Sequence, residues 1–243
     1  MSTAAIATQS GVEGRSPTQM AWQRLKKDRS AKISGSVIAF FLLLAITAPV
    51  FTWIMHTTPD EFHPETLDPE FATNPLGKFG GISGTHWFGV EPRTGRDVFL
   101  RFVYGARTSL TIALAATLVA TVIGIVIGLI SGFFGGKTDL ALSRTMEITL
   151  AFPSILFALA ITPVLENVFE GWGLPPGNGT RIPVMILVLS MFGWPYIARI
   201  VRGQVISLRE KEFVEAARAL GASPWRQVTV HILPNAMGPV IVA

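Results

Sequence analysis

Three histidines and several carboxylates share one polar stretch of this sequence, and these residue types can bind metal ions. His56, His63 and His86 are spread over residues 56–97. Their spacing does not match a compact ligand set such as H-E-x-x-H, in which one helix face presents two histidines. We therefore expect solvated loop histidines and no metal site. The chain contains no cysteine, which excludes thiolate ligands and a cysteine nucleophile. No Ser/His/Asp arrangement is readable either.

A Gly-Lys-Thr tripeptide at residues 136–138 has the residue types of a phosphate-binding loop. That motif also requires a glycine five positions before Gly136, where this sequence has Ser131, and it lies between a strand and a helix. Here the tripeptide follows an uncharged run of membrane-spanning length. The sequence therefore predicts no nucleotide site, no cofactor and no enzymatic activity in this chain.

The stretch EAARALG at residues 215–221 has the pattern of a short polar helix that ends at a glycine. Ser207 and Glu210 form a capping-box pattern, which predicts a helix over residues 208–220. The apolar positions recur at helical spacing and form one narrow stripe. These positions are Phe213, Ala216, Ala217 and Leu220.

A second helix is expected directly after this one. Gly221 can adopt the positive φ of a helix C′ residue. Ser223 and Pro224 are suited to the N-cap and the first helical position, and Pro234 is expected to end the second helix. A basic amphipathic connector lying on a membrane surface is the alternative. The small alanines argue against it, because they insert little into lipid but allow close contact with a partner.

The composition is that of a membrane protein. Apolar residues make up 49% of the 243 residues and charged residues 15%, against about 25% charged in a typical soluble domain. The net charge of +4 comes from bases that flank apolar runs. Positive-inside asymmetry explains that placement better than nucleic-acid binding does.

Four uncharged or nearly uncharged runs are long enough to cross a bilayer, which needs about 20 residues. They cover residues 33–55, 108–134, 140–165 and 182–200. Two prolines are expected to bend the third run. The final run, 234–243, is too short to cross and resembles the first half of a fifth span, so we expect an incomplete chain. The predicted fold is an all-α polytopic membrane protein.

The charges between the spans predict an orientation. The basic segments 1–32 and 202–232 belong in the cytoplasm with the turn 135–139, and the loops 56–107 and 166–181 belong outside. The first span and the loop before residue 108 would thus precede a core of residues 108–243.

Two patterns inside the spans predict side-chain contacts. Gly124, Gly128 and Gly132 fall on one helix face and would let another helix approach closely. Arg144 and Glu147 are three residues apart and can pair near one end of the third span.

The loop after the first span is acidic and rich in proline. A long ordered loop often binds a partner, so its carboxylates are candidates for an extracytoplasmic partner surface. They are Asp60, Glu61, Glu65, Asp68 and Glu70. Near the end of this loop, Asp97 could cap a helix or neutralise the neighbouring bases Arg93, Arg96 and Arg101.

Two regions resemble one family of transport proteins. GRDV at residues 95–98 and YGARTSL at 104–110 resemble the region before the second span in the smaller permease subunit of bacterial dipeptide, oligopeptide and nickel ABC importers. Residues 215–221 with Leu233-Pro234 match the spacing of the EAA loop of ABC-importer permeases. His231 departs from the general pattern, but the peptide-importer branch often has histidine there.

The resemblance extends over about residues 20–243 and implies a type I permease fold with six spans, of which this chain would hold four and part of a fifth. It implies a multi-pass protein of the bacterial inner membrane with a cytoplasmic N-terminus. The partners implied are a second permease subunit, two ABC ATPase subunits that hydrolyse the ATP, and an extracytoplasmic substrate-binding protein. The residues implied to dock the ATPase are Glu215, Ala216, Ala217, Gly221, Leu220 and Phe213.

Two other classes of membrane protein remain as alternatives. An ion-coupled secondary transporter usually carries ionisable groups at mid-membrane. Here Arg144 and Glu147, the charges within the third span, lie near its end. An intramembrane enzyme would need a buried catalytic constellation, and the sequence shows none. An external energy source is therefore the simpler expectation.

Overall fold

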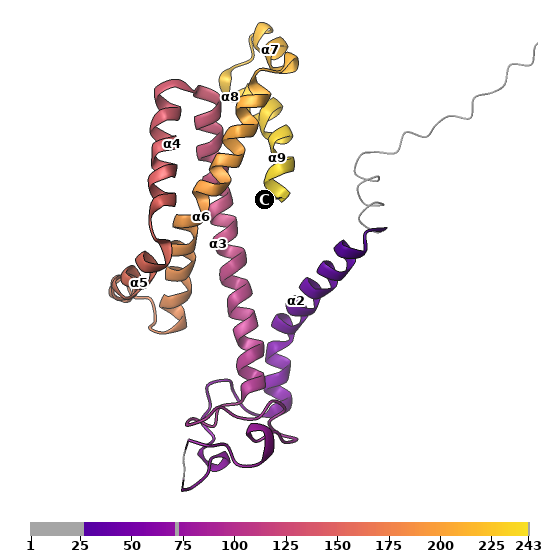
Figure 1. The fold of residues 1–243 in the computed structure, drawn as a ribbon, viewed down its shortest axis with the longest axis vertical. Helices are drawn as coiled ribbons and strands as arrows, with labels where there is room; N and C mark the ends of the chain where they lie inside the picture. The colour runs from indigo at the N-terminus through magenta and orange to yellow at the C-terminus, as the bar shows by residue number, and fades with distance from the viewer. Residues whose placement is uncertain (1–26, 71–72, 243) are drawn as a thin grey trace, which may run out of the picture. The chain divides into compact units, whose positions relative to one another are not determined.

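The computed structural model describes residues 27–70 and 73–242, and within these ranges the chain is mostly helical, with one long loop between Met55 and Val98 and no β-strand (Figure 1). Four described helices are long and apolar enough to cross a membrane. The predicted all-α polytopic fold is therefore confirmed. The chain divides into two compact units, residues 1–107 and 108–243. The predicted cytoplasmic segment 1–32 lies mostly outside the described residues.

The first unit contains the first predicted span and the polar loop that follows it. Helix α2 (Arg29–Met55) is capped by Asp28, whose Oδ1 accepts the Ser30 N–H at 2.8 Å. The loop contains two short 3₁₀ turns, Pro64–Thr66 and Lys78–Gly80. Its small apolar core joins α2 to the first turns of the next helix. Ala48, Phe99, Leu100 and Val103 form this core, with Leu44, Phe51, Met55 and Tyr104 packed against it.

Helix α3 (Val98–Phe134) begins ten residues before the predicted start of the second span. The cause is Asp97, whose Oδ1 accepts the Leu100 N–H at 2.8 Å and so satisfies a free donor of the first turn. The prediction that residues 56–107 are a loop is therefore wrong for 98–107. The prediction that Asp97 could cap a helix is confirmed.

In the second unit, α3 and α6 (Asn178–Arg209) lie side by side. Each of the three predicted glycines touches α6 directly. A Cβ added at Gly128 would lie 2.7 Å from the Val201 Cβ, and one at Gly132 would lie 2.7 Å from the Val205 Cβ. Only a residue without a side chain fits at these positions, which confirms the predicted close approach.

The third predicted span is two helices, α4 (Gly136–Ala151) and α5 (Ser154–Gly171). Phe152 between them is extended, at φ −74° and ψ 135°, as expected for a residue that precedes a proline. Figure 1 shows α5 turned away from the axis of α4. The expected bend is thus a complete break at Pro153. The predicted ion pair is present, with Arg144 NH1 2.7 Å from Glu147 Oε2.

Beyond α6 the chain forms a compact series of short helical pieces. They are α7 (Glu212–Ala219), α8 (Pro224–Arg226), a π-helical turn (Gln227–Ile232) and α9 (Leu233–Val242). Val214 of α7 and Ile232 of the π turn are fully buried against Val201 and Val205 of α6. These contacts join the predicted helix pair to the end of a spanning helix.

Candidate functional site

Helix α7 begins later than the capping-box pattern predicted. Ser207 lies inside α6, which continues to Arg209, and the N-cap of α7 is Lys211, whose side chain makes no cap hydrogen bond. The capping-box prediction is therefore wrong. Val205 and Leu208 pack in the apolar cluster below α7. Because this packing keeps the end of α6 helical, the interruption between α6 and α7 lies at Glu210 and Lys211.

The predicted end of α7 is confirmed. Gly221 has a φ of +79°, which glycine adopts without steric cost. The Ala222 N–H donates to the Ala217 carbonyl and the Gly221 N–H donates to the Arg218 carbonyl, both at 3.0 Å. This pair of bonds is a Schellman motif. It reverses the chain and directs the second helix back beside the first.

The predicted start of the second helix is also confirmed, but its predicted end is not. The Ser223 hydroxyl accepts the Arg226 N–H at 3.4 Å, with Pro224 at the first helical position. Pro234 does not end the helix, because the chain passes through the π turn into α9. There the Leu233 N–H bonds to the Val228 carbonyl five residues back. This wider turn relieves the clash that a proline ring makes with the carbonyl four residues earlier in an α-helix.

One face of helix α7 packs against the rest of the chain, and the opposite face is exposed. Val214 and Ala217 are buried, whereas Phe213, Ala216 and Leu220 are exposed, Leu220 at 89%. The predicted single apolar stripe is therefore split, and Ala217 lies at the boundary between the two faces. The exposed members are available to a partner.

The free face borders an open hollow of about 490 Å³, here called the α7 hollow. Five of the six predicted docking residues line it, and Glu215 is exposed beside it. Residues from the second helical piece complete the wall, and the docking prediction omitted them. The full lining is Phe213, Ala216, Ala217, Leu220, Gly221, Ala222, Arg226 and His231. The reversal at Gly221 was the signal that could have placed Arg226 and His231 opposite α7.

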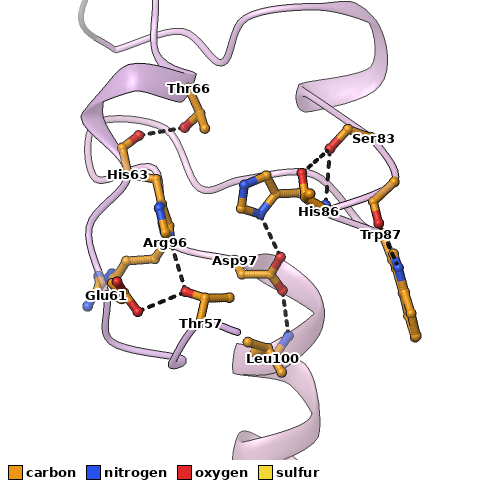
Figure 2. A network of polar contacts seen from close by, with 12 residues as sticks. Thr57, Glu61, His63, Thr66, Ser83, His86, Trp87, Arg96, Asp97 and Leu100 are labelled. Carbon is orange, nitrogen blue, oxygen red and sulfur yellow. Dashed lines mark hydrogen bonds and ion pairs between the residues drawn. The ribbon is translucent and has the colours of Figure 1, made fainter. Parts of the chain in front are cut away.

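The loop between α2 and α3, residues 56–97, is held by its own polar network, shown in Figure 2. The Thr57 hydroxyl donates to Glu61 Oε2 at 3.0 Å and lies 2.8 Å from His63 Nε2. His63 Nδ1 is 3.0 Å from Glu65 Oε1, and Asp68 accepts the Glu70 N–H at 2.8 Å. Several of the predicted partner-surface acids thus also bond within the loop.

His63 and His86 are largely buried, contrary to the prediction of solvated histidines, whereas His56 is exposed as predicted. Their side chains are 16% and 12% exposed, and their rings lie 5.2 Å apart. His86 Nδ1 is 2.9 Å from Asp97 Oδ2, and the Asp97 side chain is fully buried. His86 thus lies at the start of α3, in contact with the carboxylate that caps this helix. No group of three metal-binding side chains occurs in the described ranges 27–70 and 73–242.

The bases near Asp97 have a different partner from the predicted one. Arg96 NH2 and Arg101 NH1 lie 2.9 and 3.7 Å from Glu91 Oε2. The hydroxyl of Thr94 also donates to this carboxylate, and together with Arg96 it lowers the pKa of Glu91. Glu91 therefore neutralises Arg96 and Arg101, and Asp97 caps the start of α3 and contacts His86.

Comparisons with known proteins agree with this geometry. Residues 124–243 match the family described as the binding-protein-dependent transport system inner membrane component. Residues 16–80 match the N-terminal transmembrane domain of oligopeptide transport permease C.

Individual relatives cover most of the chain. The dipeptide transport system permease protein DppC of Alkalihalophilus pseudofirmus is 37% identical over 93% of this chain and 66% of its own length. The oligopeptide transport system permease proteins OppC of Bacillus subtilis and Escherichia coli are each 36% identical, over 90% and 95% of this chain and 63% and 68% of their own lengths. The chain thus spans about two thirds of the length of these relatives. It belongs to the family of binding-protein-dependent transport system inner membrane components, in which its relatives are dipeptide and oligopeptide permease subunits.

Proposed function

We propose that this chain is the transmembrane permease subunit of an ATP-driven importer for peptides or related small solutes. It would form half of the translocation path and pair with a second permease subunit. Two ATPase subunits would supply the energy, and an extracytoplasmic binding protein would deliver the substrate. The names of the relatives support peptides as the substrate class.

The α7 hollow is the observation that carries this proposal. A short helix whose inner face is anchored by Val214 and whose outer face is exposed has the arrangement of helix-in-groove recognition. We propose that Phe213, Ala216 and Leu220 enter a groove on the ATPase, with Glu215 and Ala217 at its margin and the turn at Gly221 fixing the angle of the second helix. Movement of the docked helix would then pass directly to α6.

Ala216→Trp tests this docking. Ala216 is exposed and lines the hollow, so an indole there should obstruct a partner without disturbing the internal packing of α7. Ala219→Trp is the matched control, because Ala219 is exposed on the same helix and does not line the hollow. We expect at least about a tenfold loss of co-purified ATPase for Ala216→Trp, as for a central interface residue, with normal membrane insertion.

The control should retain both ATPase and peptide uptake. Undiminished ATPase binding by Ala216→Trp would remove the docking proposal.

We further propose that the acidic loop faces the binding protein. Asp60 and Glu70 carry exposed carboxylates, whereas Glu61 and Glu65 are bonded within the loop. Asp60→Asn combined with Glu70→Gln should therefore lower uptake severalfold at limiting binding protein and leave it normal at saturation, as loss of electrostatic steering does. Glu170→Gln, an exposed acid on α5, is the control. If the double variant takes up peptide as fast as the parent at limiting binding protein, the two carboxylates contact only solvent.

A further inference from the structure

An ion pair ties three helices together at the end of the second unit that carries α7. Arg202 of α6 donates from Nε to Asp139 Oδ1 at 2.5 Å and from NH2 to Oδ2 at 2.7 Å. Ser131 near the end of α3 and Ser143 of α4 donate their hydroxyls to the same Oδ1, at 2.5 and 3.3 Å. These four residues are here called the Asp139–Arg202 clasp.

The clasp has the geometry of a strong ion pair. Its two side chains are 20% and 31% exposed, so water screens them less than it screens a surface pair. The hydrogen bonds from Arg202, assisted by the one from Ser131, hold the pKa of Asp139 well below its usual range. The two hydrogen bonds from the Arg202 guanidinium also fix the orientation of the Asp139 carboxylate relative to α6.

A second contact lies beside the clasp. Arg209 NH1 donates to the Gly132 carbonyl at 3.1 Å, and the carbonyls in the last turn of a helix have no partner within that helix. α6 thus reaches the end of α3 with one arginine and the start of α4 with another. Figure 1 shows the turn between α3 and α4 beside the part of α6 from which α7 follows.

The packing connects this polar cluster to α7. Only Glu210 and Lys211 separate α6 from α7. Val214 of α7 is buried with Val201 and Val205, which flank Arg202 along α6. A displacement of α7 would therefore reach α6 at the level of Arg202, because a packed apolar contact transmits a shift rather than absorbing it.

We propose that Asp139 and Arg202 are positioning residues of the transport cycle, which make the start of α4 follow α6 when α7 moves. The inference rests on the proposed docking of α7 to an ATPase. The glycine contacts already hold α3 against α6 by packing. α4 instead carries the charged partner of Arg202 at its first turn, so the clasp would convert a shift of α6 into a shift of α4.

Two substitutions test this role, Asp139→Asn and Arg202→Gln. Each is made in the full-length subunit, which is then assembled with its partners. The measurements are co-purified ATPase, basal ATP hydrolysis, and peptide taken up per ATP hydrolysed. We expect ATPase binding and basal hydrolysis within about twofold of the parent, and about a tenfold fall in uptake per ATP. The double variant should be no worse than either single one, since both remove the same contact.

The chain provides matched controls. Glu147→Gln and Arg144→Gln break an exposed ion pair of similar length on the same helix, with side chains 52% and 69% exposed. Both should keep the parent ratio of uptake to hydrolysis. Arg202→Lys keeps the charge but not the fork and should fall between the parent and Arg202→Gln. If Asp139→Asn fails to insert, Ser131→Ala and Ser143→Ala remove only the supporting hydroxyls and should give a smaller fall in the same ratio.

Three results would overturn the inference. The first is an unchanged ratio of uptake to hydrolysis in Asp139→Asn and Arg202→Gln, or in the serine variants used in their place. The second is an equal fall in the Glu147→Gln control. The third is loss of the ATPase together with uptake, which would reduce the clasp to a support for α7. Failure of the docking proposal is distinguishable, because there Ala216→Trp would retain the ATPase.

Discussion

At the scale of single residues, hydrogen bonds around Glu61 make the loop between α2 and α3 sensitive to acid. The backbone N–H of Thr58 and then the hydroxyl of Thr57 lower the pKa of Glu61 from its ordinary value of 4.5. A carboxylate with a lowered pKa in the folded state contributes stability above the ordinary value. It loses that contribution as the pH falls through the lowered one.

We therefore expect the turn at residues 57–61 to loosen as the pH falls below the ordinary pKa of Glu61, 4.5. Amide hydrogen exchange across this turn, measured at a series of pH values in detergent, is the readout. Thr57→Val removes one donor to Glu61 and should shift the loss of protection to higher pH. A turn whose protection is the same from pH 6 to pH 3 would contradict the assignment.

At the scale of elements, the contact between α3 and α6 depends on glycine. Gly128→Leu would place a side chain where even a Cβ lies 2.7 Å from the Val201 Cβ and from the Ala198 carbonyl. The helices must then separate, at a cost of about 1–3 kcal/mol for an overpacked contact. Gly105 of the same helix has no atom within 4 Å of an added Cβ, so Gly105→Leu is the control. Thermal unfolding in detergent should show a lower Tm for Gly128→Leu only, and equal Tm values would show that the contact can yield.

At the scale of the whole molecule, the orientation in the membrane can be measured directly, because the chain contains no cysteine. Single cysteines introduced near Glu65 and near Gly173 would lie in exposed loops proposed to face outward. Cysteines introduced near Lys27 and at Lys211 would lie at exposed positions proposed to face the cytoplasm. An impermeant thiol reagent should label the first two in intact cells and the last two only after lysis. Labelling of Lys211→Cys in intact cells would reverse the orientation and remove the ATPase from reach of α7.

The sequence alone determined the class of the fold and those helix ends that depend on hydrogen bonds between near neighbours in the chain. Long apolar runs predict spanning helices because lipid leaves the backbone no other hydrogen-bond partner. The helix stop at Gly221 and the start at Ser223 were predictable for the same kind of reason: both depend on bonds between near neighbours in the chain. The spacing of three glycines predicted a tight helix contact, although not which helix would make it.

Tertiary structure decided what the local signals could not. Ser207 had a capping-box pattern, but the packing of the buried Val205 and the partly buried Leu208 in the apolar cluster kept it inside α6. Asp97 was flanked by arginines in the sequence, yet its carboxylate caps α3 and contacts His86. Asp139 and Arg202 are 63 residues apart, and their pairing has no local signature. Contacts at such separations depend on which helix faces pack together, and one sequence read along its length does not contain that information.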